Sequence, residues 1–307
     1  MSEATRQPLV WLDDDTLSFG RLQILAVFDD RSQTIDSTPE RFVLVKSRHM
    51  IEWYERTFAA HPPRGVFEIG IFKGGSIALF EELWHPARLV AIDLAREPVV
   101  ALARYLDETG AATRVRPVYG VDQSDSPAMR SVLDSAFTDN GLDLVVDDGC
   151  HQLAEARLAF DTVFPYLRPG GTYVIEDWGW AHWPGVWQQD GGPWRDKPSM
   201  TSLALELLMA AASRPDLIES VEVTHELIIV RKGAAVTPTD CFDLGSSYQT
   251  AGRRFIELRL DGGGPEVTHA LLQTGRTRVA RRLRGGLGRS RRVARRIQQR
   301  LTRGPVD

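Results

Sequence analysis

The chain has 307 residues, of which 43% are hydrophobic and 25% are charged, and its formal net charge is −4. This length and apolar content suit one globular α/β domain with extensions. No apolar stretch reaches the roughly 18 residues that cross a bilayer, and the polar, acidic N-terminus lacks the blocks of a signal peptide. The two cysteines, Cys150 and Cys241, have no metal-ligand spacing, which argues against zinc and a disulfide framework. We therefore expect a soluble, cytoplasmic protein.

The charge is unevenly distributed. Residues 271–307 hold 12 arginines and one acid, which gives this segment a formal charge of +11. Because the net charge of the chain is −4, residues 1–270 carry a formal charge of −15. This Arg-rich tail is expected to be solvated and partly disordered, or to form two short basic amphipathic helices. It could contact an anionic membrane surface or an acidic partner subunit. Nucleic acid is the disfavoured partner, because the body of the chain is acidic.

The first 60 residues are interpreted as an N-terminal helical extension. An apolar run at residues 22–28 predicts a strand. The sequence Ser37-Thr38-Pro39-Glu40 is typical of a helix start, because it offers a capping hydroxyl followed by proline in the first turn. We expect that helix to run to about Ala60, before His61-Pro62-Pro63.

From residue 65, apolar runs alternate regularly with helical patterns, which predicts a doubly wound, mostly parallel α/β sheet. Strands are expected at 65–69, 88–93, 114–119, 142–147 and 171–176, and helices at 75–84, 97–108, 127–136, 152–166 and 199–212. Two late strands, 218–223 and 226–232, could form an antiparallel hairpin and bring the sheet to seven strands. We divide the chain into residues 1–60, a main domain at 61–235, an uncertain extension at 236–270 and the tail at 271–307.

A glycine-rich turn joins the first of these strands to a helix. It reads Glu68-Ile69-Gly70-Ile71-Phe72-Lys73-Gly74-Gly75-Ser76, with GxxxGG spacing instead of the GxGxxG of dinucleotide folds. Glycines let the backbone approach a ligand, and the following helix N-terminus favours negative charge. Asp93 ends the second strand, where an acid accepts hydrogen bonds from ribose, and Asp122 and Gln123 follow the third. The alternative is a turn that is rich in glycine for packing alone.

Two apolar runs end in paired carboxylates. Asp147 and Asp148 end one run, with His151 three residues on, and Glu176 and Asp177 end the next. Acids converging at strand ends repel one another unless a cation holds them, which suggests a hard-metal site beside a general base. Asp147 is expected to point away from Asp148, because side chains alternate along a strand. The alternative interpretation is that these are ordinary loop acids and a histidine at a helix start.

Taken together, E-x-G-x-x-x-G-G-S, the acid at Asp93 and G-x-D-Q resemble the S-adenosylmethionine site of class I methyltransferases. The continuation D-D-G-x-H and V-I-E-D-W resembles metal-dependent sugar O-methyltransferases of natural-product biosynthesis, of the mycinamicin, macrocin and rhamnosyl types. The match covers about residues 60–235. Cys150 departs from the family pattern, in which serine is more usual, and we expect it to alter packing more than chemistry.

The resemblance implies a role for each matching residue. It makes Asp148, Glu176 and Asp177 the Mg²⁺ ligands and His151 the general base. The residues expected to bind S-adenosylmethionine are Glu68, Gly70, Gly74, Gly75, Ser76, Asp93, Asp122, Gln123 and Asp147.

The expected reaction is methyl transfer to a sugar hydroxyl of a glycosylated small molecule, with a vicinal diol chelated by the ion. One alternative is a metal-dependent methyltransferase of a catechol-like phenol. Another is an RNA-binding protein or RNA methyltransferase that uses the basic tail. The resemblance also implies a possible homo-oligomer.

A tryptophan-rich loop follows the second acidic pair. Five tryptophans lie at positions 178, 180, 183, 187 and 194. Aromatic faces stack on sugars and flat aglycones, so the loop is expected to be a substrate lid, with ordinary loop packing as the alternative. His182 is interpreted as a loop histidine in preference to a second base.

Overall fold

A computed structural model describes residues 9–19, 22–29, 31–137, 141–184 and 192–249. The chain divides into two compact units, one of Met1–Gly185 with Lys197–Thr250 and one of Val186–Asp196 with Ala251–Asp307. In the second unit the structure describes residues 192–196, which form a turn with a hydrogen bond from Arg195 N to Gly192 O (3.4 Å). The Arg-rich tail lies outside the described residues.

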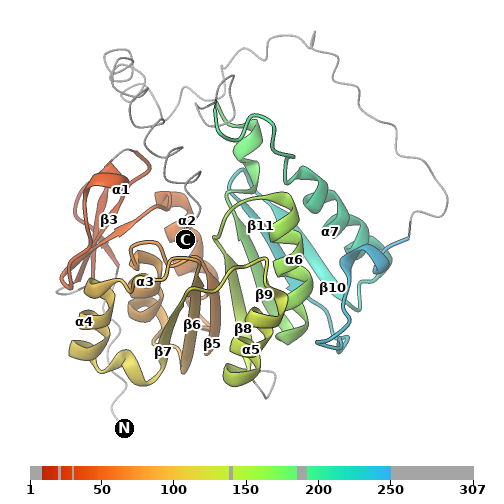
Figure 1. Ribbon diagram of the computed structural model, residues 1–307, viewed down its shortest axis with the longest axis horizontal. Coiled ribbons are helices and arrows are strands. Elements are labelled where there is room, and N and C mark those ends of the chain that lie inside the picture. The colour runs from red at the N-terminus through yellow and green to blue at the C-terminus, as the bar shows by residue number, and fades with distance from the viewer. Residues whose placement is uncertain (1–8, 20–21, 30, 138–140, 185–191, 250–307) are drawn as a thin grey trace, which may run out of the picture. The chain divides into compact units, whose positions relative to one another are not determined.

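The main sheet has seven strands in the order β10-β11-β9-β8-β5-β6-β7 (Figure 1). Its strands are β5 (Gly65–Ile69), β6 (Arg88–Asp93), β7 (Val115–Tyr119), β8 (Leu142–Asp147), β9 (Leu167–Glu176), β10 (Ile218–Val223) and β11 (Leu227–Lys232). Neighbours from β7 to β9 pair in parallel, and β11 is antiparallel to both β9 and β10. The predicted seven-stranded, mostly parallel sheet and its late hairpin are therefore confirmed.

Helices cover both faces of this sheet, as a doubly wound fold requires. They are α3 (Gly75–Trp84), α4 (Val100–Thr109), α5 (Ser126–Ala136), α6 (Leu153–Val163) and α7 (Thr201–Ser213). On one face, Val66 and Val174 share a hydrophobic cluster with residues of α3 and α4. On the other, Tyr173 packs against Phe160 of α6, with ring centroids 4.9 Å apart. Alternate residues of each strand thus serve opposite layers.

The strand order reverses between β5 and β8. The chain proceeds from β5 to β6 and β7 on one side, and β8 then begins the other half of the sheet. Ile69 pairs with Asp147 at this point, and Ile175 of β9 pairs with Asp147 from the other side. Open α/β sheets bind ligands outside the carboxyl ends of their strands at such a switch point. The predicted site residues at the ends of β5, β8 and β9 are therefore close in space.

The prediction that a helix starts at Pro39 is wrong, because the strand β4 follows at Arg41–Leu44 and the helix α2 begins at Arg48. The extension contains a four-stranded sheet of β1 (Val10–Trp11), β2 (Thr16–Phe19), β3 (Leu22–Ala26) and β4 (Arg41–Leu44), a short helix α1 (Arg31–Thr34) and the helix α2 (Arg48–Thr57). The Ser37 hydroxyl accepts from Val43 N (3.0 Å) and donates to Lys73 O (2.8 Å), so it caps no helix. Ser47 caps α2 instead, by accepting from Met50 N. The strand predicted at 22–28 is confirmed as β3.

The extension shares one hydrophobic core with the main sheet. Tyr54 of α2 meets Phe80 of α3 edge-on (5.2 Å), and Phe80 stacks on Trp84 at 4.7 Å. The backbones also approach closely, because a Cβ on Gly75 would lie 2.3 Å from Val43 O. The glycine at position 75 is thus required where β4 crosses the start of α3.

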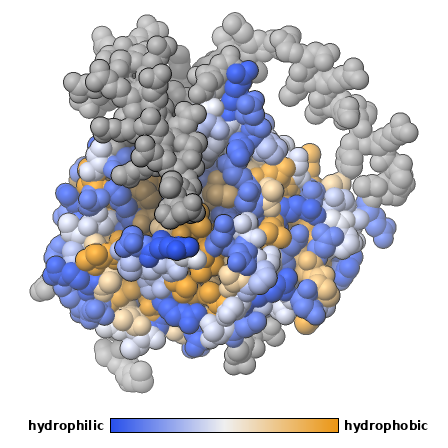
Figure 2. Space-filling view, in the orientation of Figure 1, coloured by the Kyte–Doolittle hydropathy of each residue, from blue (hydrophilic) through white to orange (hydrophobic). Residues whose placement is uncertain are grey.

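Four 3₁₀ turns complete the elements: η1 (Ala111–Thr113), η2 (Phe164–Tyr166), η3 (Trp178–His182) and η4 (Leu244–Ser246). On the face seen in Figure 2, apolar side chains form patches among hydrophilic ones. Within the described ranges, no helix has the length and apolar character needed to cross a membrane.

Replacing Gly75 by alanine should destabilise the protein by about 1–3 kcal/mol, because the new methyl group meets the Val43 carbonyl. Urea unfolding followed by circular dichroism measures this free energy. Gly141→Ala is the matched control, since its Cβ would meet no atom within 4 Å, and it should change stability by less than about 0.5 kcal/mol. Equal stability of the two variants would contradict the packing of β4 on α3.

Candidate active site

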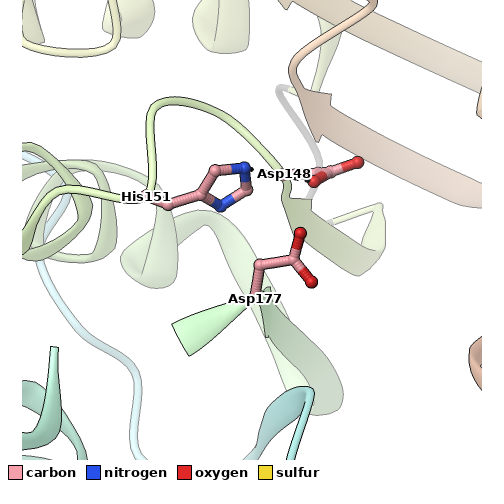
Figure 3. Close-up of side chains that lie close together, drawn as sticks. All are labelled: Asp148, His151 and Asp177. Carbon is pink, nitrogen blue, oxygen red and sulfur yellow. Dashed lines mark ion pairs between the residues drawn. The ribbon is translucent and has the colours of Figure 1, made fainter. Parts of the chain in front are cut away.

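Three side chains from two loops converge beyond the ends of β8 and β9. Asp148 and His151 follow β8, and Asp177 follows β9; Figure 3 shows all three facing one another. One ligand atom of each lies within 4.8 Å of the others. His151 Nε2 is 3.7 Å from Asp148 Oδ1. The structure thus brings together the predicted base and two of the three predicted ion ligands.

The Asp177 carboxylate lacks a complete set of partners. Its residue has a φ of 53°, in the left-handed region, and starts the η3 turn. Oδ1 is buried and has no hydrogen-bond partner among the described residues. Burial, with the negative charge of Asp148, raises the pKa of Asp177 above its usual range. An orphaned buried carboxylate oxygen is costly, and this donor set suits a hard divalent cation that prefers oxygen ligands.

The loop that carries His151 is held from three elements. Asp148 N donates to Ile69 O of β5 (2.9 Å), and Cys150 N donates to Oε1 of Gln123 (2.8 Å). Trp180 Nε1 donates to the carbonyl of His151 (2.9 Å). These bonds hold His151 at a φ of 54°, a strained conformation for a residue with a side chain. The loop is therefore fixed before any ligand binds.

Glu176 binds side chains of the extension. Tyr54 OH donates to its Oε1 (2.7 Å), and Lys46 Nζ donates to its Oε2 (2.5 Å). The same Nζ donates to Asp148 Oδ2 at 2.7 Å. Burial opposes charge on Lys46, but the charges of Asp148, Glu176 and Glu68 raise its pKa above the ordinary value. Glu176 as an ion ligand stays a prediction.

The sequence interpretation missed Lys46 and Tyr54. The run Phe42-Val43-Leu44-Val45-Lys46 is apolar and ends in a charge, which is the same signal that pointed to the acids after β8 and β9. Assigning this run to a helix concealed it. Tyr54 carried no signal, because an aromatic residue on an amphipathic helix usually packs in the core.

The glycine-rich turn lies beside the His151 loop. Glu68 is fully buried, and burial raises the pKa of its carboxyl to about 8. Gly70 has a φ of 102°, and a Cβ there would lie 2.2 Å from Asp148 O. Gly74 is the left-handed cap of α3, and Ser76 is buried in its first turn. Packing thus explains part of the glycine pattern, and the cofactor roles of these residues and of Gly75 stay predictions.

The acids after β6 and β7 organise their own turns. Asp93 Oδ2 accepts from the backbone N–H groups of Ile71 (2.8 Å) and Phe72 (3.0 Å), so it shapes the glycine-rich turn. Asp122 is exposed and accepts from Ser124 N and Oγ, which lower its pKa. Their contacts with a cofactor stay predictions.

Gln123 and Asp147 lie on the inner side of the site. Gln123 is buried and turns toward the His151 loop, and its Nε2 has no partner within the described part of the chain. Asp147 accepts from Tyr173 OH (3.2 Å), and burial raises its pKa to about 7. Its partners differ from those of Asp148, as alternation along a strand predicts. Their cofactor roles also stay predictions.

The first tryptophans of the loop have structural partners. Trp178 Nε1 donates to Thr224 O (2.8 Å), and Trp180 is buried behind His151. His182 Nε2 lies 2.7 Å from Thr201 Oγ1, which agrees with a loop histidine. Trp187 lies outside the described residues, so the lid stays a prediction.

Comparison with known proteins identifies the class. Residues 67–178 match the profile of a methyltransferase domain family, so the chain carries a methyltransferase domain. The 8-demethyl-8-alpha-L-rhamnosyl tetracenomycin-C 2'-O-methyltransferase of Streptomyces olivaceus is 33% identical over 224 residues, which cover 68% of this chain and 50% of that protein. Demethylmacrocin O-methyltransferase of Streptomyces fradiae is 34% identical over 191 residues, covering 55% and 44%. The chain spans about half the length of these curated relatives.

Among solved structures, similarity extends to the MycE methyltransferase from the mycinamycin biosynthetic pathway, in complex with Mg, SAH and mycinamycin VI. It is 26% identical with a TM-score of 0.46, and the match covers 59% of this chain and 49% of that one.

Replacing Gln123 by alanine should loosen the His151 loop, because Cys150 N loses its buried acceptor. Losing this partly buried hydrogen bond should cost about 0.5–1.5 kcal/mol, which should appear as faster hydrogen exchange in a peptide covering residues 148–152. Cys150→Ser is the control, because it keeps the hydrogen bond from the backbone N–H of residue 150 to Gln123. Its hydrogen exchange in this peptide should equal that of wild type. Equal protection in wild type and Gln123→Ala would contradict this role of Gln123.

Proposed function

We propose that the protein is an S-adenosylmethionine- and Mg²⁺-dependent O-methyltransferase that acts on a sugar hydroxyl of a glycosylated small molecule. The observation that carries the proposal is the convergence of Asp148, His151 and Asp177 at the carboxyl edge of a methyltransferase-domain sheet. The names of the curated relatives support the substrate class, since they include a rhamnosyl tetracenomycin-C 2'-O-methyltransferase.

The methyl donor would lie on the β5 side of the switch point. The glycine-rich turn and Asp93 would hold S-adenosylmethionine, with the N-terminus of α3 directed at it. Asp147 would face its amino-acid end, while Asp122 and Gln123 would be nearest the adenine. The acceptor sugar would then approach from the β8–β9 side, next to His151.

Asp148 and Asp177 would hold Mg²⁺, and Glu176 is the third ligand that the sequence predicts. When bound, the ion would polarise a sugar hydroxyl and its neighbour and lower the hydroxyl pKa. The orphaned Asp177 Oδ1 and the spacing of the three side chains support an ion here.

His151 would act as the general base. Its Nε2 would accept the hydroxyl proton as the oxygen forms a bond to the methyl carbon and the carbon–sulfur bond breaks. The bonds from Trp180 to the His151 carbonyl and from Cys150 to Gln123 hold the backbone that carries the imidazole. Much of the rate gain would come from this fixed geometry.

His151→Ala should lower turnover by about 10²–10⁴-fold, because general base catalysis contributes that much. The affinity for S-adenosylhomocysteine, measured by calorimetry, should not change. His182→Ala is the matched control and should keep turnover, since His182 lies beside Thr201 instead of the acids. A fully active His151→Ala variant would contradict the base assignment.

Removing the ion should abolish methyl transfer, because the sugar hydroxyl then keeps its high pKa. Methylation of a panel of rhamnosides and other deoxyglycosides, followed with radiolabelled S-adenosylmethionine, should require Mg²⁺ and stop in EDTA. Asp177→Ala should remain inactive when Mg²⁺ is restored. Full activity in EDTA would refute the metal part of the proposal, and methylation of free catechols but no glycoside would refute its substrate class.

A further inference from the structure

The segment that joins β4 to α2 reaches the acidic edge of the main sheet. Lys46 Nζ contacts Glu176 and Asp148, and the hydroxyl of Ser47 donates to Glu226 Oε2 at 2.8 Å. About two helical turns further on, Tyr54 donates to Glu176. The extension thus supplies three side chains to the loop after β8, the end of β9 and the turn between β10 and β11.

Lys46 is a buried cation in an acidic environment. Its side chain is 0% exposed, and those of its partners Glu176 and Asp148 are 1% and 24% exposed. Glu68 is also buried and within electrostatic reach of the same ammonium. Uncompensated charges at such depth are strongly unfavourable. Lys46 therefore compensates part of the negative charge of these carboxylates.

The oxygens that Lys46 and Tyr54 bind differ from those that face the candidate ion site. Glu176 uses one oxygen for each of these two partners. Asp148 turns Oδ2 to Lys46 and Oδ1 to His151. Asp177 Oδ1 has no partner within the described ranges.

We propose that Lys46 is a positioning residue that keeps Glu176 out of the ion's ligand set and leaves Asp148 and Asp177 to hold the ion. Lys46 and Tyr54 occupy both oxygens of Glu176, whereas Lys46 occupies one oxygen of Asp148 and leaves Oδ1 on the side of His151. An ion at Glu176 would therefore have to displace one of these donors. The inference rests on the proposed ion site, and it assigns Glu176 a role other than the one its sequence suggests.

The test is Mn²⁺ binding to the full chain, measured by electron paramagnetic resonance in wild type, Glu176→Gln, Asp177→Asn and Tyr54→Phe. Glu176→Gln and Tyr54→Phe should bind Mn²⁺ within about twofold of wild type, whereas Asp177→Asn should lose at least about tenfold, as expected when a ligand is removed. If Glu176→Gln loses as much affinity as Asp177→Asn, the inference is wrong although the ion site exists. If wild type binds no Mn²⁺, the proposed ion site fails, and the inference with it.

A second series removes the ammonium. Lys46→Met should bind Mn²⁺ about tenfold more tightly, a gain of about 1.4 kcal/mol, and Mg²⁺ should raise its melting temperature more than that of wild type. A role confined to folding would lower the melting temperature without changing the ion affinity, and that result would contradict the inference. Should Lys46→Met fail to fold, Lys46→Met/Glu176→Gln removes both charges of the pair and should bind Mn²⁺ as wild type does. A tenfold loss in that double variant would also contradict it.

Discussion

The described structure depends on gathering several buried and partly buried carboxylates at one edge of a parallel sheet. Glu68, Asp148, Glu176 and Asp177 come from the ends of three strands that meet at the switch point. Their mutual repulsion and loss of hydration are unfavourable unless cations or donors compensate. Lys46 and Tyr54 donate the compensating hydrogen bonds to Glu176, and a divalent ion would supply the compensating charge for Asp177. The N-terminal extension is therefore part of the site as well as a neighbour of the sheet.

The same edge contains local strain. His151 and Asp177 each follow a buried strand and each has a positive φ near 53°, at a cost on the order of 1–3 kcal/mol per residue. Such conformations persist only where the surroundings determine them. Here Gln123 and Trp180 hold the His151 loop, and the neighbouring strand β5 is buried along its whole length. The arrangement turns both side chains toward the same point, which a regular strand continuation would not do.

The sheet and its edge could be predicted because parallel strands buried on both faces are continuous apolar runs. The runs ending at Asp147 and at Glu176 were clear for this reason. The extension could not be predicted in the same way, because Ser37 has the sequence of a helix cap, whereas its hydroxyl bonds to Val43 and Lys73, far apart in the sequence. Likewise, motif spacing places Glu176 at the edge but cannot reveal that Lys46, from the segment between β4 and α2, bonds to its carboxylate.

The most direct measurement is the anomalous scattering of Mn²⁺ in crystals of the full chain grown with S-adenosylhomocysteine. The account predicts one manganese peak between the carboxylates of Asp148 and Asp177, near the His151 imidazole, with Lys46 still bonded to Glu176. A peak coordinated by Glu176, with the Lys46 side chain displaced, would contradict it, as would the absence of any peak at this edge of the sheet.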